Sequence, residues 1–184
     1  MSAVKRLICA VLCVLISVSL LTGCRDSLSD SAGSWLEDRI SYKGEAGRIM
    51  DESGEIMRCI KEKDKEGMKL LFCEKVRNTS GFDEQIDSIF DFIDSGDTWS
   101  YDIKTTASGG QSVSGGEVTD WDVHPEIRDV QVAYDRGNYF DHKYYSIDYY
   151  WHIVCEDDKS LEGIQYMRIE LLNVETLEIG EYVG

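Results

Sequence analysis

Residues Tyr144 to Cys155, with the sequence YYSIDYYWHIVC, alternate between two kinds of side chain. The odd-numbered positions are aromatic or apolar: Tyr145, Ile147, Tyr149, Trp151, Ile153 and Cys155. The even-numbered positions are more polar: Tyr144, Ser146, Asp148, Tyr150 and His152. Because successive side chains of a β-strand point to opposite faces of its sheet, this pattern predicts a strand whose odd-numbered face lies in the core.

Shorter segments on both sides of this strand alternate in the same way. They are residues 99–104, 117–123, 127–134 and 163–174. Two glycine pairs, Gly109-Gly110 and Gly115-Gly116, predict the turns of a loose hairpin between the first two segments. Their spacing matches no phosphate-binding fingerprint. The second half of the chain is therefore predicted to be an antiparallel sheet.

The segments before these strands have a helical period instead. In residues 46–63, four apolar side chains fall at helical spacing: Ile49, Ile56, Met57 and Ile60. Asp64 is placed to cap a second helix. Residues 82–93 repeat apolar side chains at positions i, i+4, i+7, i+8 and i+11 and predict a third helix. Helices followed by an antiparallel sheet predict an α+β fold in which the helices cover one sheet face.

Four features of the sequence resemble the small bacterial lipoprotein family catalogued as domain of unknown function 5104. They are KDKEGMKLLFC at residues 63–73, the helix at 82–92, the glycine hairpin, and Glu162-Gly163-Ile164 before the last predicted strand. The order of elements also resembles the nuclear-transport-factor-2-like superfamily, which includes ketosteroid isomerase. The resemblance covers residues 46–174 and implies N-terminal helices packed on a curved antiparallel sheet, with a cone-like cavity between them.

The first residues have the layout of a signal peptide. Lys5 and Arg6 precede a 15-residue apolar run, LICAVLCVLISVSLL at residues 7–21. The run ends at Leu21-Thr22-Gly23-Cys24, which resembles the lipobox of bacterial lipoproteins, where the cysteine takes a diacylglycerol and becomes the new N-terminus. We therefore expect Cys24 to carry a lipid anchor on the extracytoplasmic side of the cell membrane. An ordinary secretory signal or a buried apolar helix remains the alternative.

The chain is accordingly divided into three parts. Residues 1–23 form the leader, residues 24–45 a flexible polar tether, and residues 46–184 a single α+β domain. The 35 acidic residues outnumber the 19 basic residues and give a net charge of −16. Because such a chain repels phosphates, nucleic-acid binding is excluded as a function.

Three cysteines of the predicted domain follow Cys24: Cys59, Cys73 and Cys155. An odd number of cysteines leaves at least one thiol without an intramolecular partner. Cys59 and Cys73 fall on adjacent predicted helices with an axial offset that makes a bridge awkward. We expect buried free thiols.

No catalytic constellation can be assigned from the sequence. Asp102, Asp129 and Asp148 lie on the polar faces of predicted strands, where solvated carboxylates are the ordinary interpretation. No pairing of serine, histidine and aspartate, or of cysteine and histidine, can be justified from the sequence.

A metal site is conceivable in one extended segment. Asp120, Asp122 and His124 share one side of residues 120–124. Alternate acids are common in so acidic a chain, and no second ligand cluster is identifiable, so no metal or cofactor is assigned. His142 and His152 are interpreted as surface or hydrogen-bonded strand residues.

Aromatic side chains provide the candidate binding site. Trp99, Tyr101, Tyr145, Tyr149 and Trp151 are predicted to line a pocket that stacks on an apolar or sugar-like ligand. Core packing against the third helix is the competing interpretation. On the opposite face, Tyr144 and Tyr150, together with Tyr139, suit a protein partner.

The function expected from these features is that of a lipid-anchored extracytoplasmic module. It would bind a small ligand or a protein partner without catalysis. The alternative is a small acid–base enzyme that acts on an apolar or ring-containing substrate in a cone cavity.

Overall fold

The computed structural model describes residues 25–93, 95–135 and 140–182, with side chains described at 44–93, 95–134 and 142–182. The leader and Cys24 lie outside the described residues. The chain divides into two units, Met1–Glu45 and Ala46–Gly184. Within the described part, no helix is both long enough and apolar enough to cross a membrane.

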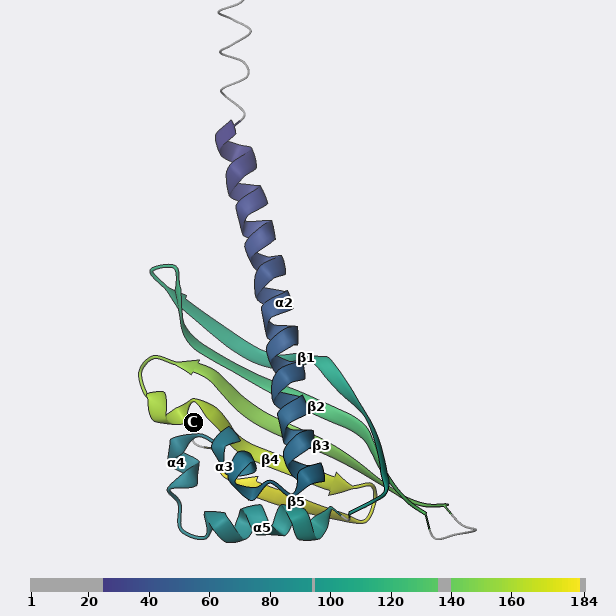
Figure 1. The fold of residues 1–184 in the computed structure, drawn as a ribbon. Coiled ribbons are helices and arrows are strands. Elements are labelled where there is room, and N and C mark those ends of the chain that lie inside the picture. The colour runs from purple at the N-terminus through teal and green to yellow at the C-terminus, as the bar shows by residue number, and fades with distance from the viewer. Residues whose placement is uncertain (1–24, 94, 136–139, 183–184) are drawn as a thin grey trace, which may run out of the picture. The chain divides into compact units, whose positions relative to one another are not determined.

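The helices come first in the chain, as predicted (Figure 1). They are α2 (Arg25–Glu62), α3 (Lys65–Leu71), α4 (Glu74–Arg77) and α5 (Phe82–Phe92). Asp64 caps α3, as predicted, because its carboxylate accepts a hydrogen bond from the Gly67 N–H at 2.9 Å. The short helix α4 was not predicted.

Helix α2 begins much earlier than the sequence indicates. Residues 25–43, predicted to lack a helical period, belong to α2. The stretch contains no proline, and it continues into a segment whose apolar face is buried from Ile49 onward. Extending an existing helix is much easier than starting one, which explains how a weakly patterned segment becomes helical. Its role as a tether stays a prediction.

In the described part of the chain, five antiparallel strands follow the helices and lie side by side in chain order (Figure 1). They are β1 (Thr98–Ser114), β2 (Glu117–Asp135), β3 (Phe140–Cys155), β4 (Gly163–Leu171) and β5 (Glu175–Gly180). A 3-10 helix, η1 (Lys159–Leu161), links β3 to β4. Helices followed by an antiparallel sheet confirm the predicted α+β class.

Strand boundaries differ from the prediction in three places. Gly109 and Gly110 lie within β1 rather than in a turn. A Cβ atom on Gly109 would lie 2.0 Å from the backbone oxygen of Asp122, so this glycine permits close contact between strands. The two segments predicted at 117–123 and 127–134 form one strand, β2. The last predicted strand ends at Leu171, and β5 was missed.

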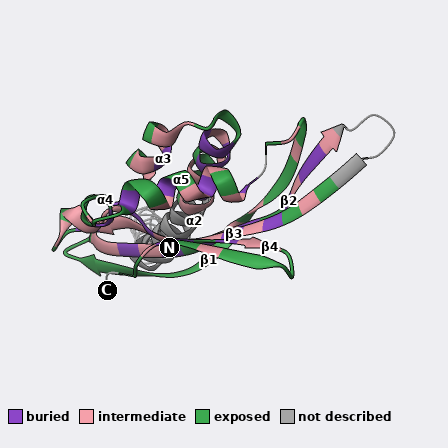
Figure 2. Ribbon diagram, turned by 90° about the horizontal axis from the view of Figure 1, so that it is seen from below, coloured by how far each residue is buried: buried purple, intermediate pink, exposed green. Residues whose placement is uncertain are grey.

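The core lies between the helices and one face of the sheet. Figure 2 shows α3, α4 and α5 on one side of the sheet. Ile56 and Met57 of α2 and Ile86 of α5 are fully buried in the same cluster as Ile147 and Tyr149 of β3. The Tyr149 hydroxyl lies 2.8 Å from the Ser53 hydroxyl of α2, so the buried polar atoms satisfy each other.

Gly163 lies where the start of β4 meets the segment between α3 and α4. Phe72 and Ile164 form an isolated parallel bridge, and the Cys73 N–H donates to the Ile164 oxygen at 2.9 Å. Gly163 has a φ of +121°, and a Cβ atom there would lie 2.7 Å from the Cys73 nitrogen. Both the backbone angle and the space therefore require glycine.

We expect Gly163→Ala to lower the free energy of unfolding by about 2–3 kcal/mol, because alanine is strained at this φ and collides with Cys73. Chemical denaturation monitored by circular dichroism measures the loss. The control is Gly54→Ala in α2, where a Cβ atom meets nothing within 4 Å. That substitution should raise stability by about 0.5–1 kcal/mol, since alanine favours helix. Equal stability of the two variants would contradict the assignment.

Candidate ligand-binding site

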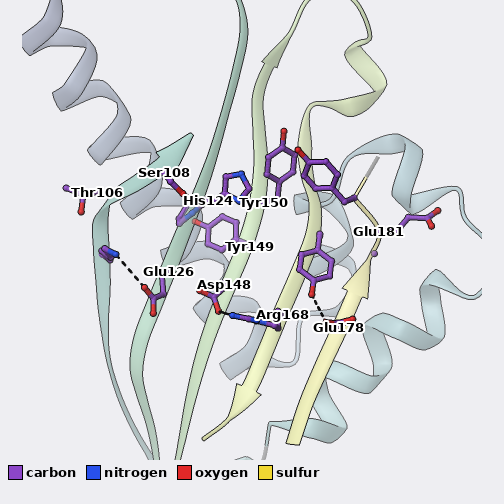
Figure 3. A pocket seen from close by; sticks show the side chains of 15 residues that line it. Thr106, Ser108, His124, Glu126, Asp148, Tyr149, Tyr150, Arg168, Glu178 and Glu181 are labelled. Carbon is purple, nitrogen blue, oxygen red and sulfur yellow. Dashed lines mark hydrogen bonds and ion pairs between the residues drawn. The ribbon is translucent and has the colours of Figure 1, made fainter. Parts of the chain in front are cut away.

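A cavity of about 710 Å³ lies over the sheet face that the helices leave uncovered (Figure 3). Each strand contributes a polar side chain to its lining: Lys104, Glu126, Asp148, Arg168 and Glu178. On β3, β4 and β5 these positions alternate with buried core residues such as Ile147, Met167 and Ile179. The cavity is therefore formed by the polar face of the same strands whose apolar face forms the core.

Aromatic rings gather at one end of this cavity. The ring of Tyr150 lies 4.5 Å from that of His124 and 4.6 Å from that of Tyr182, measured between centroids. Tyr150 is only 7% exposed, whereas Tyr182 is 62% exposed, so the rings extend from the sheet surface into solvent. Such a group offers flat apolar surfaces to a ring-containing ligand.

Charged groups along the sheet are paired with one another. Arg168 contacts Asp148 at 3.0 Å, and the Tyr166 hydroxyl donates to Glu178 at 2.8 Å. Glu126 lies 3.7 Å from the Lys104 ammonium.

Ion pairing shifts the pKa of two groups in the cavity lining. The Arg128 guanidinium beside Glu126 holds the pKa of that carboxyl below its ordinary value. Asp148 raises the pKa of the Arg168 guanidinium through their hydrogen bond. Ionised carboxylates accept hydrogen bonds and repel anions, so the cavity suits neutral or cationic ligands.

The structure separates the five aromatic residues predicted to share a pocket. Tyr149 lines the cavity and is also part of the core, whereas Tyr145 is fully buried in the core. Trp151 is partly buried against that core, and Tyr101 is 37% exposed. Trp99 lines a separate hollow of about 230 Å³.

The cavity residues carried a signal that the sequence interpretation did not use. Asp148 and Tyr150 alternate on β3, and Tyr166 and Arg168 alternate on β4. The sequence interpretation assigns Tyr150 to a protein partner together with Tyr144 and with Tyr139, which lies outside the described residues. Aromatic and charged residues alternating on the polar face of two neighbouring strands would have indicated a binding surface.

A carboxylate with a raised pKa lies in the helical layer, on the side of the sheet opposite the cavity. Burial, and secondarily the charge of Glu55, raises the pKa of Glu52 on α2 from 4.5 to about 7. Burial also raises the pKa of Tyr149, whose hydroxyl meets Ser53. Glu52 does not line the cavity on the outer face.

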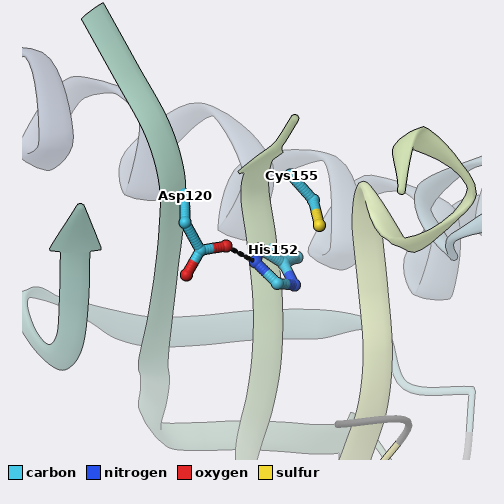
Figure 4. Close-up of side chains that lie close together, drawn as sticks. All are labelled: Asp120, His152 and Cys155. Atoms are coloured by element: carbon cyan, nitrogen blue, oxygen red, sulfur yellow. Dashed lines mark hydrogen bonds and ion pairs between the residues drawn. The ribbon is translucent and has the colours of Figure 1, made fainter. Parts of the chain in front are cut away.

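The segment 120–124, to which the sequence interpretation assigns no metal, is divided between two interactions. His124 Nε2 lies 3.7 Å from Asp122, while the Asp120 carboxylate lies 2.6 Å from His152 Nε2 (Figure 4). Cys155 completes a group with Asp120 and His152 in which the ligand atoms lie within 4.8 Å of one another. The structure thus brings Asp120 together with two residues of β3 that the prediction did not include.

Other side chains considered in the sequence are either exposed carboxylates or buried thiols. Asp102 and Asp129 are exposed, as predicted for solvated carboxylates. Cys59, Cys73 and Cys155 are all buried, as predicted, and none of the three forms a disulfide.

Comparison with known proteins finds one family. The sequence profile described as "Domain of unknown function (DUF5104)" matches residues 55–176, which is more than half of the chain. The matched range includes α3, α4, α5, all of β1 to β4 and every cavity residue up to Arg168. No curated protein matches the chain.

The raised pKa of Glu52 predicts a pH-dependent stability. Because the folded protein holds this proton more tightly, the contribution of Glu52 to the free energy of unfolding should fall as pH rises from about 4.5 to 7. Glu52→Gln removes the ionisation, so the variant should match the wild type at pH 4 and exceed it by about 1–3 kcal/mol at pH 8. Urea denaturation across this pH range measures the difference.

The exposed carboxylate of Glu84 on α5 provides the control. Glu84→Gln should leave the pH profile of the wild type unchanged. A constant stability difference between Glu52→Gln and the wild type at every pH would contradict burial of the charge.

Proposed function

The chain belongs to the DUF5104 family of domains of unknown function, and we propose that it is a non-catalytic module that binds a neutral, ring-containing ligand such as a sugar. The observation that carries the proposal is the 710 Å³ cavity with aromatic rings at one end and paired carboxylates along its floor. This volume lies within the range of about 300–1,000 Å³ that is typical of small-molecule sites.

The lining determines the class of ligand. A sugar ring has an apolar face that packs on Tyr150 or Tyr182, and hydroxyls that donate to Asp148 or Glu178. Lys104 and Arg168 are the basic residues of the lining, and each already pairs with a carboxylate. An anionic ligand would have to displace these partners, which disfavours it.

The same pairs support binding without catalysis. A carboxylic acid that donates a proton in glycoside or carbonyl chemistry needs a raised pKa. Glu126 has a lowered pKa, and Asp148 pairs with Arg168 at 3.0 Å. Both groups are suited to accept hydrogen bonds from a ligand rather than to protonate it.

The second candidate function is an acid–base enzyme, and Glu52 is the observation that favours it. Its pKa of about 7 suits a general acid or base at neutral pH. The nearby phenol of Tyr149 already exchanges a hydrogen bond with Ser53 and lies in the core. This candidate ranks second because Glu52 does not belong to the cavity that has room for a ligand.

The finer fold assignment is part of the proposal. A cone of the nuclear-transport-factor-2-like type is supported by the order of elements, helices first and a curved antiparallel sheet after. The described cavity lies on the outer sheet face rather than between helices and sheet.

We also propose that the domain is held at the extracytoplasmic side of the cell membrane by a lipid on Cys24. The support is the basic start, the apolar run at 7–21 and the Leu21-Thr22-Gly23-Cys24 sequence. Residues 24–45 would then separate the domain from the membrane surface.

A ligand screen tests the binding proposal. Neutral mono- and disaccharides should include ligands that raise the melting temperature of the full chain, because binding to the folded state alone stabilises it. For such a ligand, Tyr182→Ala should weaken affinity about tenfold in calorimetry through loss of ring packing. Tyr144→Ala, an exposed tyrosine of the same sheet outside the cavity lining, should leave affinity unchanged.

Two results would count against this function. One is a screen in which no neutral ring compound stabilises the chain. The other is an equal loss of affinity in Tyr182→Ala and Tyr144→Ala, which would place the ligand elsewhere. Binding that vanishes in Glu52→Gln, together with turnover of the ligand, would instead support the enzyme.

Metabolic labelling tests the anchor. In bacterial cells supplied with radiolabelled palmitate, the wild type should incorporate label and Cys24→Ser should not. Cys13→Ser serves as the control because it changes a leader cysteine while leaving residues 21–24 intact. An unlabelled wild-type chain that still carries residues 1–23 by mass spectrometry would exclude the anchor.

A further inference from the structure

An irregularity in the pairing of β2 with β3 places three ligand-type side chains on one sheet face. Asp120 pairs with Cys155 and Asp122 pairs with His152, while Trp121 pairs with Val154. Ile153 is therefore an extra residue, and its β-bulge turns both His152 and Cys155 to the face of Asp120. Without the bulge, residues three apart in a strand would point to opposite faces.

A second bulge brings a supporting side chain to the same place. Tyr150 pairs with Tyr166 and Trp151 pairs with Ile164, so Gln165 is the extra residue of β4. Gln165 is 1% exposed, and its Nε2 lies 3.1 Å from His152 Nδ1. Two bulges thus converge on the imidazole of His152.

We propose that Asp120, His152 and Cys155 form a site for a single Zn²⁺ ion. Carboxylate oxygen, imidazole nitrogen and thiolate sulfur are the three donor types that zinc takes in proteins. Calcium and magnesium prefer all-oxygen sites, so the thiol and imidazole disfavour them. Three protein ligands leave a fourth position for water.

The geometry needs only a small adjustment to close around the ion. The three ligand atoms lie within 4.8 Å of one another. Tetrahedral zinc with bonds of about 2.0–2.3 Å holds its ligand atoms roughly 3–4 Å apart. The side chain of Asp120 is 46% exposed, so it is able to move, and that of His152 is 11% exposed. The ion would enter from the Asp120 side.

Neighbouring groups are placed to orient the ligands. Glu162 Oε1 accepts the Cys155 backbone N–H at 3.0 Å and fixes the start of the loop after β3. If zinc took His152 Nε2, the ring proton would lie on Nδ1, and rotation of the Gln165 amide, whose Nε2 now also contacts the Leu161 oxygen at 3.4 Å, would present its oxygen to that N–H. A metal-bound histidine usually donates its second N–H to such an acceptor. The Cys155 thiol releases its proton on coordination.

The same residue types also occur in the nucleophilic triads of cysteine hydrolases, but the geometry disfavours that interpretation. A triad needs one histidine nitrogen toward the thiol and the other toward the carboxylate. Here Nε2 faces Asp120 at 2.6 Å and Nδ1 faces Gln165 at 3.1 Å. Both ring nitrogens are therefore hydrogen-bonded to groups other than the Cys155 thiol.

The zinc site is independent of the proposed ligand function. None of its three residues belongs to the lining of the 710 Å³ cavity. Failure of a sugar screen would therefore not contradict the zinc proposal, and failure of zinc binding would not contradict the proposal of a sugar ligand.

Zinc competition against a chromophoric chelator tests the proposal on the full chain, reduced and freed of metal beforehand. The wild type should take up one zinc ion, and Asp120→Asn and Cys155→Ser should each weaken binding at least about tenfold. Cobalt replaces zinc in a parallel titration. A thiolate-to-cobalt charge-transfer band should appear in the wild type and be lost in Cys155→Ser.

Matched controls separate this site from other thiols and acids. Asp122→Asn changes the next carboxylate on the same face of β2, and Cys59→Ala removes a different buried thiol. Both should keep wild-type zinc affinity and the cobalt band, and circular dichroism should show each variant folded. The proposal is overturned if the wild type yields all its zinc to the chelator. It is equally overturned if folded Asp120→Asn and Cys155→Ser bind as tightly as the controls.

Discussion

Burial of the β3 face that carries Ile147 and Tyr149 determines which face of the sheet meets the helices, and the hydrogen bond between Tyr149 and Ser53 satisfies the polar atoms at that contact. A buried tyrosine hydroxyl without a partner would cost free energy, so β3 must place Tyr149 under α2 where Ser53 lies at 2.8 Å. Because side chains alternate along a strand, Asp148 and Tyr150 then point to the opposite face and into the cavity. A shift of one residue would exchange the core and the binding surface. Core and site therefore depend on the same register.

Much of this fold could be predicted from the sequence, because its signals are local. The 3.6-residue period of Phe82, Ile86 and Ile89 and the alternation of Tyr145, Ile147 and Tyr149 depend only on burial of one face. Features that depend on a partner strand could not be predicted in this way. Gly109 is predicted to lie in a turn because glycine is common in turns. Its actual role, close contact with the backbone of Asp122 on the next strand, cannot be read from the residues around it.

The candidate sites were harder to predict, for a related reason. Strict alternation placed Cys155 on the core face with Trp151 and away from His152. The bulge at Ile153 reverses this, and a bulge is defined by pairing with β2 rather than by the residues of β3 alone. Likewise, the sequence predicts a pocket among aromatic residues of the core face, whereas the cavity lies on the outer face of the sheet. The period of the apolar residues identifies the side chains that are buried in the core. It gives no information about a binding surface on the polar face of the same strands.

The order of the strands has a consequence for how the chain acquires its structure. Each strand pairs with the strand next to it in the sequence, so the sheet can assemble hairpin by hairpin through short loops. The contact of α2 with β3 instead joins residues 96 positions apart. Closing so long a loop costs more entropy than forming a hairpin. Assembly of the sheet is therefore expected to precede docking of α2, which closes the hydrophobic core last.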